Sequence, residues 1–244
     1  MNAIETKGLT KRFGQKTAVD HIDLTVGEGE LFALLGVNGA GKTTTIRMLS
    51  GLSAPTEGQC SVCGKDCVAE KAQVKGMIGL SPQDTAVAEN LTVLENLHFM
   101  AQVHGLKGDS KQQRVQEMIR QFRMEEVLSS RAKTLSGGWK RKLSIAMALI
   151  SQPRVLFLDE PTLGLDVLAR RELWRVIESL KGKVTVLLTT HYMEEAEQLA
   201  DRIAVMIGGR IAAMGTLTEL EQLTGKTGLE ECFVTIAEGG MENA

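Results

Sequence analysis

The sequence predicts an α/β fold, and two short apolar runs and one glycine-bearing loop carry that prediction. Residues 31–35 are continuously apolar, as expected of a central strand that is covered on both faces. A loop at 36–41 follows at once, and a helix is predicted from there to about residue 52. A second apolar run, at 155–158, has the length of another central strand. Together these features indicate an open sheet with helices packed on its faces.

The other elements follow from local patterns along the chain. Ile22, Leu24 and Val26 alternate with polar residues, the period of a half-buried strand. Residues 59–82 read as short strands joined by a polar connection, and the apolar spacing over 92–150 favours a separate helical lobe. In the last third we expect, in order, a helix at 167–181, a strand at 184–189, a helix at 193–200, a hairpin of strands 203–207 and 210–214, a short helix at 218–223 and an edge strand at 232–236.

Composition places the chain among ordinary globular proteins. Its 244 residues are 43% hydrophobic and 24% charged, with a formal net charge of −2. This excludes a disordered chain and argues against a broad basic face, so we expect no nucleic-acid partner. No apolar stretch approaches the ~20 residues that cross a bilayer, and the first residues lack the apolar core of a secretion signal. The four cysteines form no disulfide framework, so the expected location is the cytoplasm.

Residues 36–43 match the P-loop pattern G-x-x-x-x-G-K-[ST]. The glycines let successive backbone N–H groups curl around phosphate oxygens, and the following helix turns its partially positive N-terminus toward them. Lys42 adds a full charge at the β- and γ-phosphates, and the Thr43 hydroxyl can ligate Mg²⁺. An ordinary glycine-rich turn is the alternative, but the number of chance matches expected in such a chain is only roughly 0.02. The predicted nucleotide-binding residues are Gly36, Asn38, Gly39, Ala40, Gly41, Lys42, Thr43 and Thr44.

The apolar run at 155–158 ends in two carboxylates, Asp159 and Glu160, and resembles a Walker-B strand. Such a strand buries its body and delivers both side chains at its C-terminal edge, where ligands of open α/β sheets bind. There Asp159 would hold Mg²⁺ through water, and Glu160 would orient and deprotonate an attacking water. Apolar strands that end in acids are common, so this interpretation depends on the P-loop upstream.

A third motif, Ser136-Gly137-Gly138, stands between these two. Taken alone it reads as a helix N-cap followed by a flexible turn. Its hydroxyl and amides also form an anion site at the start of the helix predicted at 139–150. Placed between a P-loop and a Walker-B strand, it resembles the signature motif of ATP-binding-cassette (ABC) ATPases. In that family the signature is offered to ATP held by a second copy of the cassette.

The resemblance implies roles for further residues, each of which has a plainer reading as a core, loop or surface side chain. Phe13 would stack on adenine, and Gln83 matches the glutamine that contacts Mg²⁺ or water and joins the two lobes. Asp166 falls in a loop that crosses the dimer interface, and His191 matches the switch histidine that contacts the γ-phosphate. With ATP and Mg²⁺ as cofactors, the expected catalytic residues are Glu160, His191 and Gln83, and the expected metal residues are Thr43, Gln83 and Asp159.

Two features close to the signature carry their own expectations. Trp139 stands where many members of the family have Gln, which affects contacts to the partner's nucleotide rather than the anion site. The basic run Lys140-Arg141-Lys142 is expected on a solvated helix face. Contacts with the opposite subunit or its nucleotide are the alternative for these three side chains.

The resemblance also implies the organisation of the chain. The fold would be a P-loop NTPase (RecA-like) core with an antiparallel β subdomain and an inserted α-helical subdomain. The ABC ATPase domain would span 1–225, with the core and β subdomain at 1–83 and 151–215, the helical subdomain at 84–150 and a C-terminal tail at 226–244. Two copies, most simply a homodimer, would close head to tail around two Mg-ATP molecules. A separate transmembrane permease chain would hold them at the inner face of the cell membrane.

Two segments favour export over import. Residues 90–97 resemble the sequence after the Q-loop in exporter-type members, including antibiotic-efflux ATPases, and residues 229–233 resemble their C-terminal end. The expected function is ATP hydrolysis that drives an exporter. The alternative is a non-transport ABC ATPase that acts as a mechanical switch on another assembly. A P-loop GTPase or kinase would leave Ser136-Gly137-Gly138 without a reason, and the guanine motif Asn-Lys-x-Asp does not occur.

Overall fold

The computed structural model describes residues 2–241 and confirms the α/β fold. Its main sheet has six strands: β3 (Leu31–Leu35), β6 (Ile78–Ser81), β7 (Val155–Asp159), β8 (Thr185–Thr190), β9 (Arg202–Ile207) and β10 (Arg210–Gly215). Their order is β10-β9-β3-β8-β7-β6, and all neighbours are parallel except β10 with β9. Over residues 2–241, none of the helices has both the length and the apolar character needed to cross a membrane.

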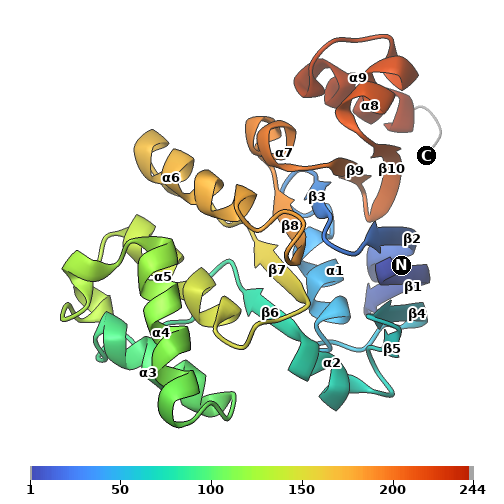
Figure 1. Cartoon of the computed structure of the whole chain (residues 1–244). Helices are drawn as coiled ribbons and strands as arrows, with labels where there is room; N and C mark the ends of the chain where they lie inside the picture. The colour runs from blue at the N-terminus through green and yellow to red at the C-terminus, as the bar shows by residue number, and fades with distance from the viewer. Residues whose placement is uncertain (1, 242–244) are drawn as a thin grey trace.

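A second, antiparallel sheet lies beside the first (Figure 1). It consists of β1 (Asn2–Phe13), β2 (Lys16–Gly27), β4 (Glu57–Val62) and β5 (Lys65–Asp66), in the order β2-β1-β4-β5. The side chains of β3 alternate between two hydrophobic cores. Phe32 and Leu34 pack in the core that includes this second sheet, whereas Leu31, Ala33 and Leu35 pack in the larger core on the other face. This covering on both faces explains why β3 reads as an uninterrupted apolar run.

Nine α-helices complete the described part of the chain. They are α1 (Lys42–Leu49), α2 (Lys71–Met77), α3 (Val93–Val103), α4 (Gly108–Phe122), α5 (Gly137–Leu149), α6 (Val167–Glu178), α7 (Met193–Leu199), α8 (Leu217–Thr224) and α9 (Leu229–Met241). Figure 1 shows α3, α4 and α5 gathered on the side of the core sheet away from β1 and β2. The face of α4 that the apolar spacing predicts, Val115, Met118, Ile119 and Phe122, is buried.

The edge strand predicted at 232–236 is wrong, because these residues lie within the helix α9. Leu229, Cys232 and Phe233 are buried, and Ile236 packs against the same core. The spacing of these four residues is that of one helix face, and this tertiary packing outweighs the local preference of Phe233 to Ile236 for extended backbone. The polar connection expected within 59–82 likewise contains a helix, α2.

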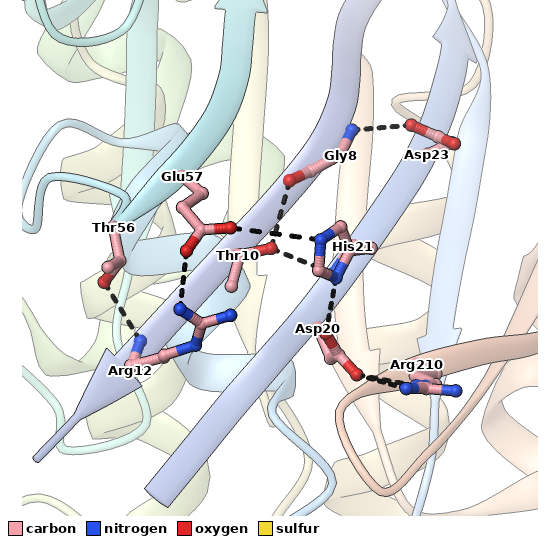
Figure 2. Close-up of polar contacts among 9 residues, drawn as sticks. All are labelled: Gly8, Thr10, Arg12, Asp20, His21, Asp23, Thr56, Glu57 and Arg210. Atoms are coloured by element: carbon pink, nitrogen blue, oxygen red, sulfur yellow. Dashed lines mark hydrogen bonds and ion pairs between the residues drawn. The ribbon is translucent and has the colours of Figure 1, made fainter. Parts of the chain in front are cut away.

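Hydrogen bonds connect β2 to the β9–β10 hairpin, and the hairpin to the P-loop. The Asp20 N–H donates to the Gly209 carbonyl at 2.8 Å, and the Gly209 N–H donates to the Ala40 carbonyl at 3.0 Å. Arg210 Nε donates to Asp20 Oδ2 at 2.7 Å, and Figure 2 shows Asp20 held between Arg210 and His21. Hydrogen bonds from His21 and then Arg210 lower the pKa of Asp20. The two sheets are thereby joined beside the loop that the sequence assigns to nucleotide binding.

Candidate functional site

Close backbone packing sets the shape of the loop between β3 and α1. A Cβ atom at Gly36 would collide with the Met206 carbonyl oxygen, and one at Gly41 would collide with the Ala18 carbonyl oxygen. Gly41 also has a φ of 110°, a conformation that side chains with a Cβ rarely adopt. Gly41 is the N-cap of α1, so the loop delivers its chain directly into the first turn of that helix. The unpaired N–H groups of this turn form the kind of N-terminus that binds phosphate.

Lys42 is the first residue of α1 and is buried, with 5% of its surface exposed. Its ammonium donates to the Gly36 and Val37 carbonyl oxygens at 2.7 and 3.2 Å. The same ammonium lies 3.1 Å from Glu160 Oε1. A buried cation needs such partners, since desolvation without them costs several kcal/mol. In this structure the Lys42 ammonium is therefore bound by two carbonyl oxygens of its own P-loop and by Glu160.

Asp159 ends β7 with its carboxylate turned toward the P-loop. Its Oδ1 accepts hydrogen bonds from Thr43 Oγ1 at 3.0 Å and from Thr189 Oγ1 at 2.6 Å. The parallel register of β7 and β8 places Asp159 opposite Thr189. A hydroxyl and a carboxylate in contact are hard oxygen donors of the kind that Mg²⁺ prefers. These residues fit a magnesium ion that also binds phosphate oxygens.

Glu160 follows Asp159 and leaves the strand in a left-handed conformation, with a φ of 49°. Its N–H donates to Thr189, and its side chain turns back between two basic residues. Oε1 faces Lys42, and Oε2 is 2.6 Å from His191 Nδ1. Positive φ at a residue other than glycine costs of order 1 kcal/mol and is found where surrounding contacts impose it. Glu160 is thus held at one point between the P-loop and the residue after β8.

A cavity of about 450 Å³ opens over the P-loop. This volume lies within the range of small-molecule sites, about 300–1,000 Å³. Phe13, the last residue of β1, lines the cavity with 56% of its surface exposed. The predicted site residues that line the cavity are Phe13, Asn38, Gly39, Ala40, Gly41, Lys42, Thr43, Thr44, Gln83 and Glu160. Gly36, Asp159 and His191 do not line it but touch residues that do.

The four remaining predicted residues also lie outside this cavity: Ser136, Gly137, Gly138 and Asp166. Ser136 is the N-cap of α5, and its hydroxyl accepts the Trp139 N–H at 3.5 Å. Asp166 is the N-cap of α6 and accepts the Leu168 and Ala169 N–H groups at 2.9 Å. A Cβ atom added to Gly138 would come within 3.1 Å of the Ala169 side chain, so the two helix starts are neighbours. A single chain therefore does not bring the signature to the P-loop cavity.

Two of the three residues in the basic run after the signature are buried, which corrects the expectation of a solvated face, whereas Lys140 is partly exposed. Arg141 and Lys142 expose only 5% and 8% of their surface. Arg141 donates from its two terminal nitrogens to the Pro82 and Gln83 carbonyl oxygens, each at 2.7 Å. Lys142 pairs with Glu172 at 2.7 Å. The partners of both side chains belong to the same chain, and Arg141 connects α5 to the backbone of Gln83.

Lys142 also accounts for the environment of Trp139. Its ammonium lies 4.4 Å from the centre of the Trp139 ring, a cation–π geometry. The indole of Trp139 is half-buried against α5 and the neighbouring core. The residue that departs from the signature of many relatives is therefore tied to its own helix.

Sequence reasoning missed several residues around the site. Lys16, Ala18 and Leu163 line the cavity, and Thr189 bonds Asp159. Lys16 and Ala18 stand close to Phe13, and Leu163 stands close to Glu160, so proximity to motif residues is a signal that could have found them. Thr189 is one β-branched residue in an apolar strand, and only the register of β7 with β8 gives it a role.

Known proteins resemble this chain over most of its length. Residues 19–163 match the family model described as ABC transporter. The daunorubicin resistance ATP-binding protein DrrA3 of Streptomyces coeruleorubidus is 43% identical over 243 residues, 99% of this chain and 76% of that protein. The probable multidrug ABC transporter ATP-binding protein YbhF of Escherichia coli strain K12 is 42% identical over 219 residues, 89% of this chain but 38% of that protein. A solved ATP-binding subunit of an ABC transporter is 32% identical, with a TM-score of 0.87 over 96% of this chain and 99% of that one.

Proposed function

This chain belongs to the ABC transporter family and is an ATPase, and from that premise we propose that one copy supplies only half of each catalytic site. The supporting observation is the separation of the two predicted phosphate-binding groups. Lys42 and Thr43 line the cavity, whereas Ser136 and the start of α5 do not. A second copy, turned head to tail, would place its Ser136 hydroxyl and helix N-terminus against the open side of a bound triphosphate.

In the proposed half-site each group has a defined task. Phe13 stacks on the adenine ring, and the N–H groups of residues 38–43, together with Lys42, bind the β- and γ-phosphates of ATP. Thr43, Gln83 and Asp159 would hold Mg²⁺. When bound, that ion neutralises charge on the phosphate oxygens and helps to orient the γ-phosphate.

Hydrolysis requires Glu160 to exchange partners. In this structure its carboxylate is paired with Lys42 and hydrogen-bonded to His191. A triphosphate competes for the Lys42 ammonium and leaves Glu160 free to accept a proton from the attacking water. His191 would keep its contact with Glu160 and contact the γ-phosphate. Binding of ATP would thus free Glu160 to act as the general base in its hydrolysis.

We also propose how the cassette transmits its cycle. The division into a core and β subdomain (1–83 and 151–215), a helical subdomain (84–150) and a tail (226–244) makes Gln83 the joint between two parts. Arg141 donates two hydrogen bonds to the backbone at that joint. A shift of Gln83 toward the nucleotide would therefore pull α5, and with it the signature, in the same movement.

A separate permease chain would receive this movement at the inner face of the cell membrane. The segment after Gln83 and helix α3 offer a surface for it, because Phe99 and Val103 expose 52% and 61% of their surface there. Export is the proposed direction. The support is the resistance and multidrug function in the names of the two relatives.

Cross-linking tests the composite site. Asn38→Cys and Ser136→Cys are introduced together in a Glu160→Gln background, because slow hydrolysis keeps ATP in place. Cys60, Cys67 and Cys232 are buried, and Cys63, which is partly exposed, is replaced by Ser in every variant. Mild oxidation with Mg-ATP should give a covalent dimer, which is absent without ATP and absent for either cysteine alone. Bound ATP without a cross-link would refute the head-to-tail arrangement.

A further inference from the structure

A buried carboxyl lies on α7, outside the set of residues that the sequence assigns to the site. Glu195 is fully buried, and its Oε1 accepts a hydrogen bond from Trp174 Nε1 at 3.1 Å. Trp174 lies on α6, the helix whose N-cap is Asp166. Burial of a carboxyl is costly unless its surroundings compensate for the lost hydration. The contacts of Glu195 therefore matter for the arrangement of the elements around it.

Two hydroxyls complete the surroundings of this carboxyl. Burial raises the pKa of Glu195, while the adjacent Thr190 and Thr162 hydroxyls and the Trp174 N–H lower it, and the charge of Glu160 raises it further. Thr162 and Thr190 belong to different segments of the chain. Three segments thus lie next to Glu195: α6, the turn after β7 and the end of β8.

These segments carry Glu160, the proposed general base, and His191, proposed to contact the γ-phosphate. Thr162 is two residues after Glu160, in a turn where the Leu163 N–H donates to the Glu160 carbonyl at 3.2 Å. Thr190 directly precedes His191, and its hydroxyl accepts the Tyr192 N–H at 3.0 Å. The Thr190 carbonyl in turn accepts the Gly36 N–H at 3.2 Å. Glu195 is buried beside both threonines and is anchored to Trp174, so its side chain limits how far the two segments can move relative to each other.

We propose that Glu195 is a positioning residue for ATP hydrolysis, which holds the turn after Glu160 and the end of β8 so that Glu160 and His191 meet. The proposal rests on the roles proposed above for these two residues. Their side chains are 2.6 Å apart, a contact that a shift of 1 Å in either segment would break. Loss of Glu195 should therefore reduce the rate of the chemical step more than it reduces ATP binding.

The contact with Thr162 also gives the nucleotide a way to act on this carboxyl. Among the described residues, neither Glu195 Oε2 nor Thr162 Oγ1 has a hydrogen-bond partner. A small movement of the turn at 161–163 can therefore align or separate them. Leu163, in the same turn, lines the cavity and would touch a bound nucleotide. Thr162 and Leu163 are adjacent, so a nucleotide that touches Leu163 can change the alignment of Thr162 with Glu195.

Steady-state hydrolysis by the full chain tests the proposal. Glu195→Ala should lower kcat about tenfold or more, with KM and the affinity for trinitrophenyl-ATP changed less than about threefold. Glu195→Gln keeps an oxygen for Trp174 and gains a donor for the threonines, so it should retain most of the wild-type kcat. Glu197→Gln, an exposed site on the same helix, controls for the loss of one carboxyl. Thermal unfolding verifies that each variant is folded at the assay temperature.

Each outcome of these assays either supports or contradicts the positioning role of Glu195. A kcat for Glu195→Ala within about twofold of wild type, or equal losses in the Ala and Gln variants, would overturn the proposal. If the Ala variant does not fold, Trp174→Phe replaces it, because it removes the N–H donor and keeps an aromatic ring in the core. A severalfold fall in kcat is expected for Trp174→Phe, and an unchanged kcat contradicts the proposal. Failure of the composite site would show instead as ATP binding without the Asn38–Ser136 cross-link.

Discussion

The ammonium of Lys42 lies 3.1 Å from the carboxylate of Glu160, and the two side chains expose only 5% and 6% of their surface. Lys42 also donates to two carbonyl oxygens of the P-loop, so its charge is fully engaged by the protein. An incoming phosphate must replace these contacts rather than meet a free cation. Because Glu160 also contacts His191, this replacement reaches both the proposed general base and the histidine proposed to contact the γ-phosphate.

Replacement of Lys42 by Ala should weaken nucleotide binding about tenfold or more. The change removes the only full charge in the P-loop and leaves Glu160 buried without its cation, which costs stability as well. Titration with trinitrophenyl-ATP measures the first effect, and urea unfolding measures the second. Lys183→Ala, at an exposed position, serves as the control and should match wild type in both measurements. Wild-type affinity in Lys42→Ala would mean that the phosphates do not reach this loop.

Replacement of Glu160 by Gln should reduce turnover about a hundredfold or more, because loss of a general base removes rate factors of about 10²–10⁴. ATP affinity should be retained, since Lys42 keeps its two carbonyl partners and loses only one anionic competitor. Phosphate release and equilibrium binding are measured on the same preparation. Glu178→Gln, exposed at the end of α6, should hydrolyse ATP at the wild-type rate. Turnover near wild type in Glu160→Gln would assign the proton transfer to another group.

The parts of the site that lie on strand-to-loop junctions could be predicted from sequence. The P-loop, Asp159 and Glu160 each follow a buried apolar strand, and parallel strands bring their C-terminal ends to one edge of a sheet. His191 follows β8 in the same way. For these residues the local pattern determines the position because the strand register is the only tertiary information needed.

Other features depend on packing between distant segments and gave no local signal. Arg141 reads as a surface residue in a basic run, and its burial follows only from the approach of α5 to the Pro82–Gln83 backbone. Glu195 is an ordinary acid on a seven-residue helix until α6 brings Trp174 beside it. Residues 232–236 resemble a strand locally, yet their helical face fits the core. In each case tertiary contacts outweigh local preference.

Replacement of Arg141 by Met should lower the free energy of unfolding by about 1–3 kcal/mol, because the Pro82 and Gln83 carbonyls lose their donors. Arg141→Lys should be nearly as unstable as Arg141→Met, since one ammonium cannot reproduce the planar guanidinium that reaches both carbonyl oxygens. Turnover should fall about threefold or more in both variants, because Gln83 is no longer fixed to α5. Urea unfolding and phosphate release provide the two measurements.

Lys140→Met is the matched control for the Arg141 variants. Lys140 is the neighbouring base, and it reaches only the exposed Glu89 at 3.7 Å. Its replacement should change neither stability nor turnover measurably. Equal effects of the Lys140 and Arg141 variants would show that net charge, not the grip on the Gln83 backbone, sets the activity.

The stability of the chain relative to Glu195→Gln should decline as pH rises. Burial, the largest influence, raises the pKa of Glu195 above its ordinary 4.5, and the nearby charge of Glu160 acts in the same direction. A group whose pKa is raised by folding stabilises fully below its ordinary pKa and loses that contribution as pH rises through the folded value. Glutamine does not titrate, so the difference in unfolding free energy between the two proteins isolates this group. Urea unfolding at intervals from about pH 5 to about pH 8 should show the difference shifting steadily in favour of Glu195→Gln. A constant difference over that range would contradict the raised pKa and leave Glu195 ionised in the folded protein.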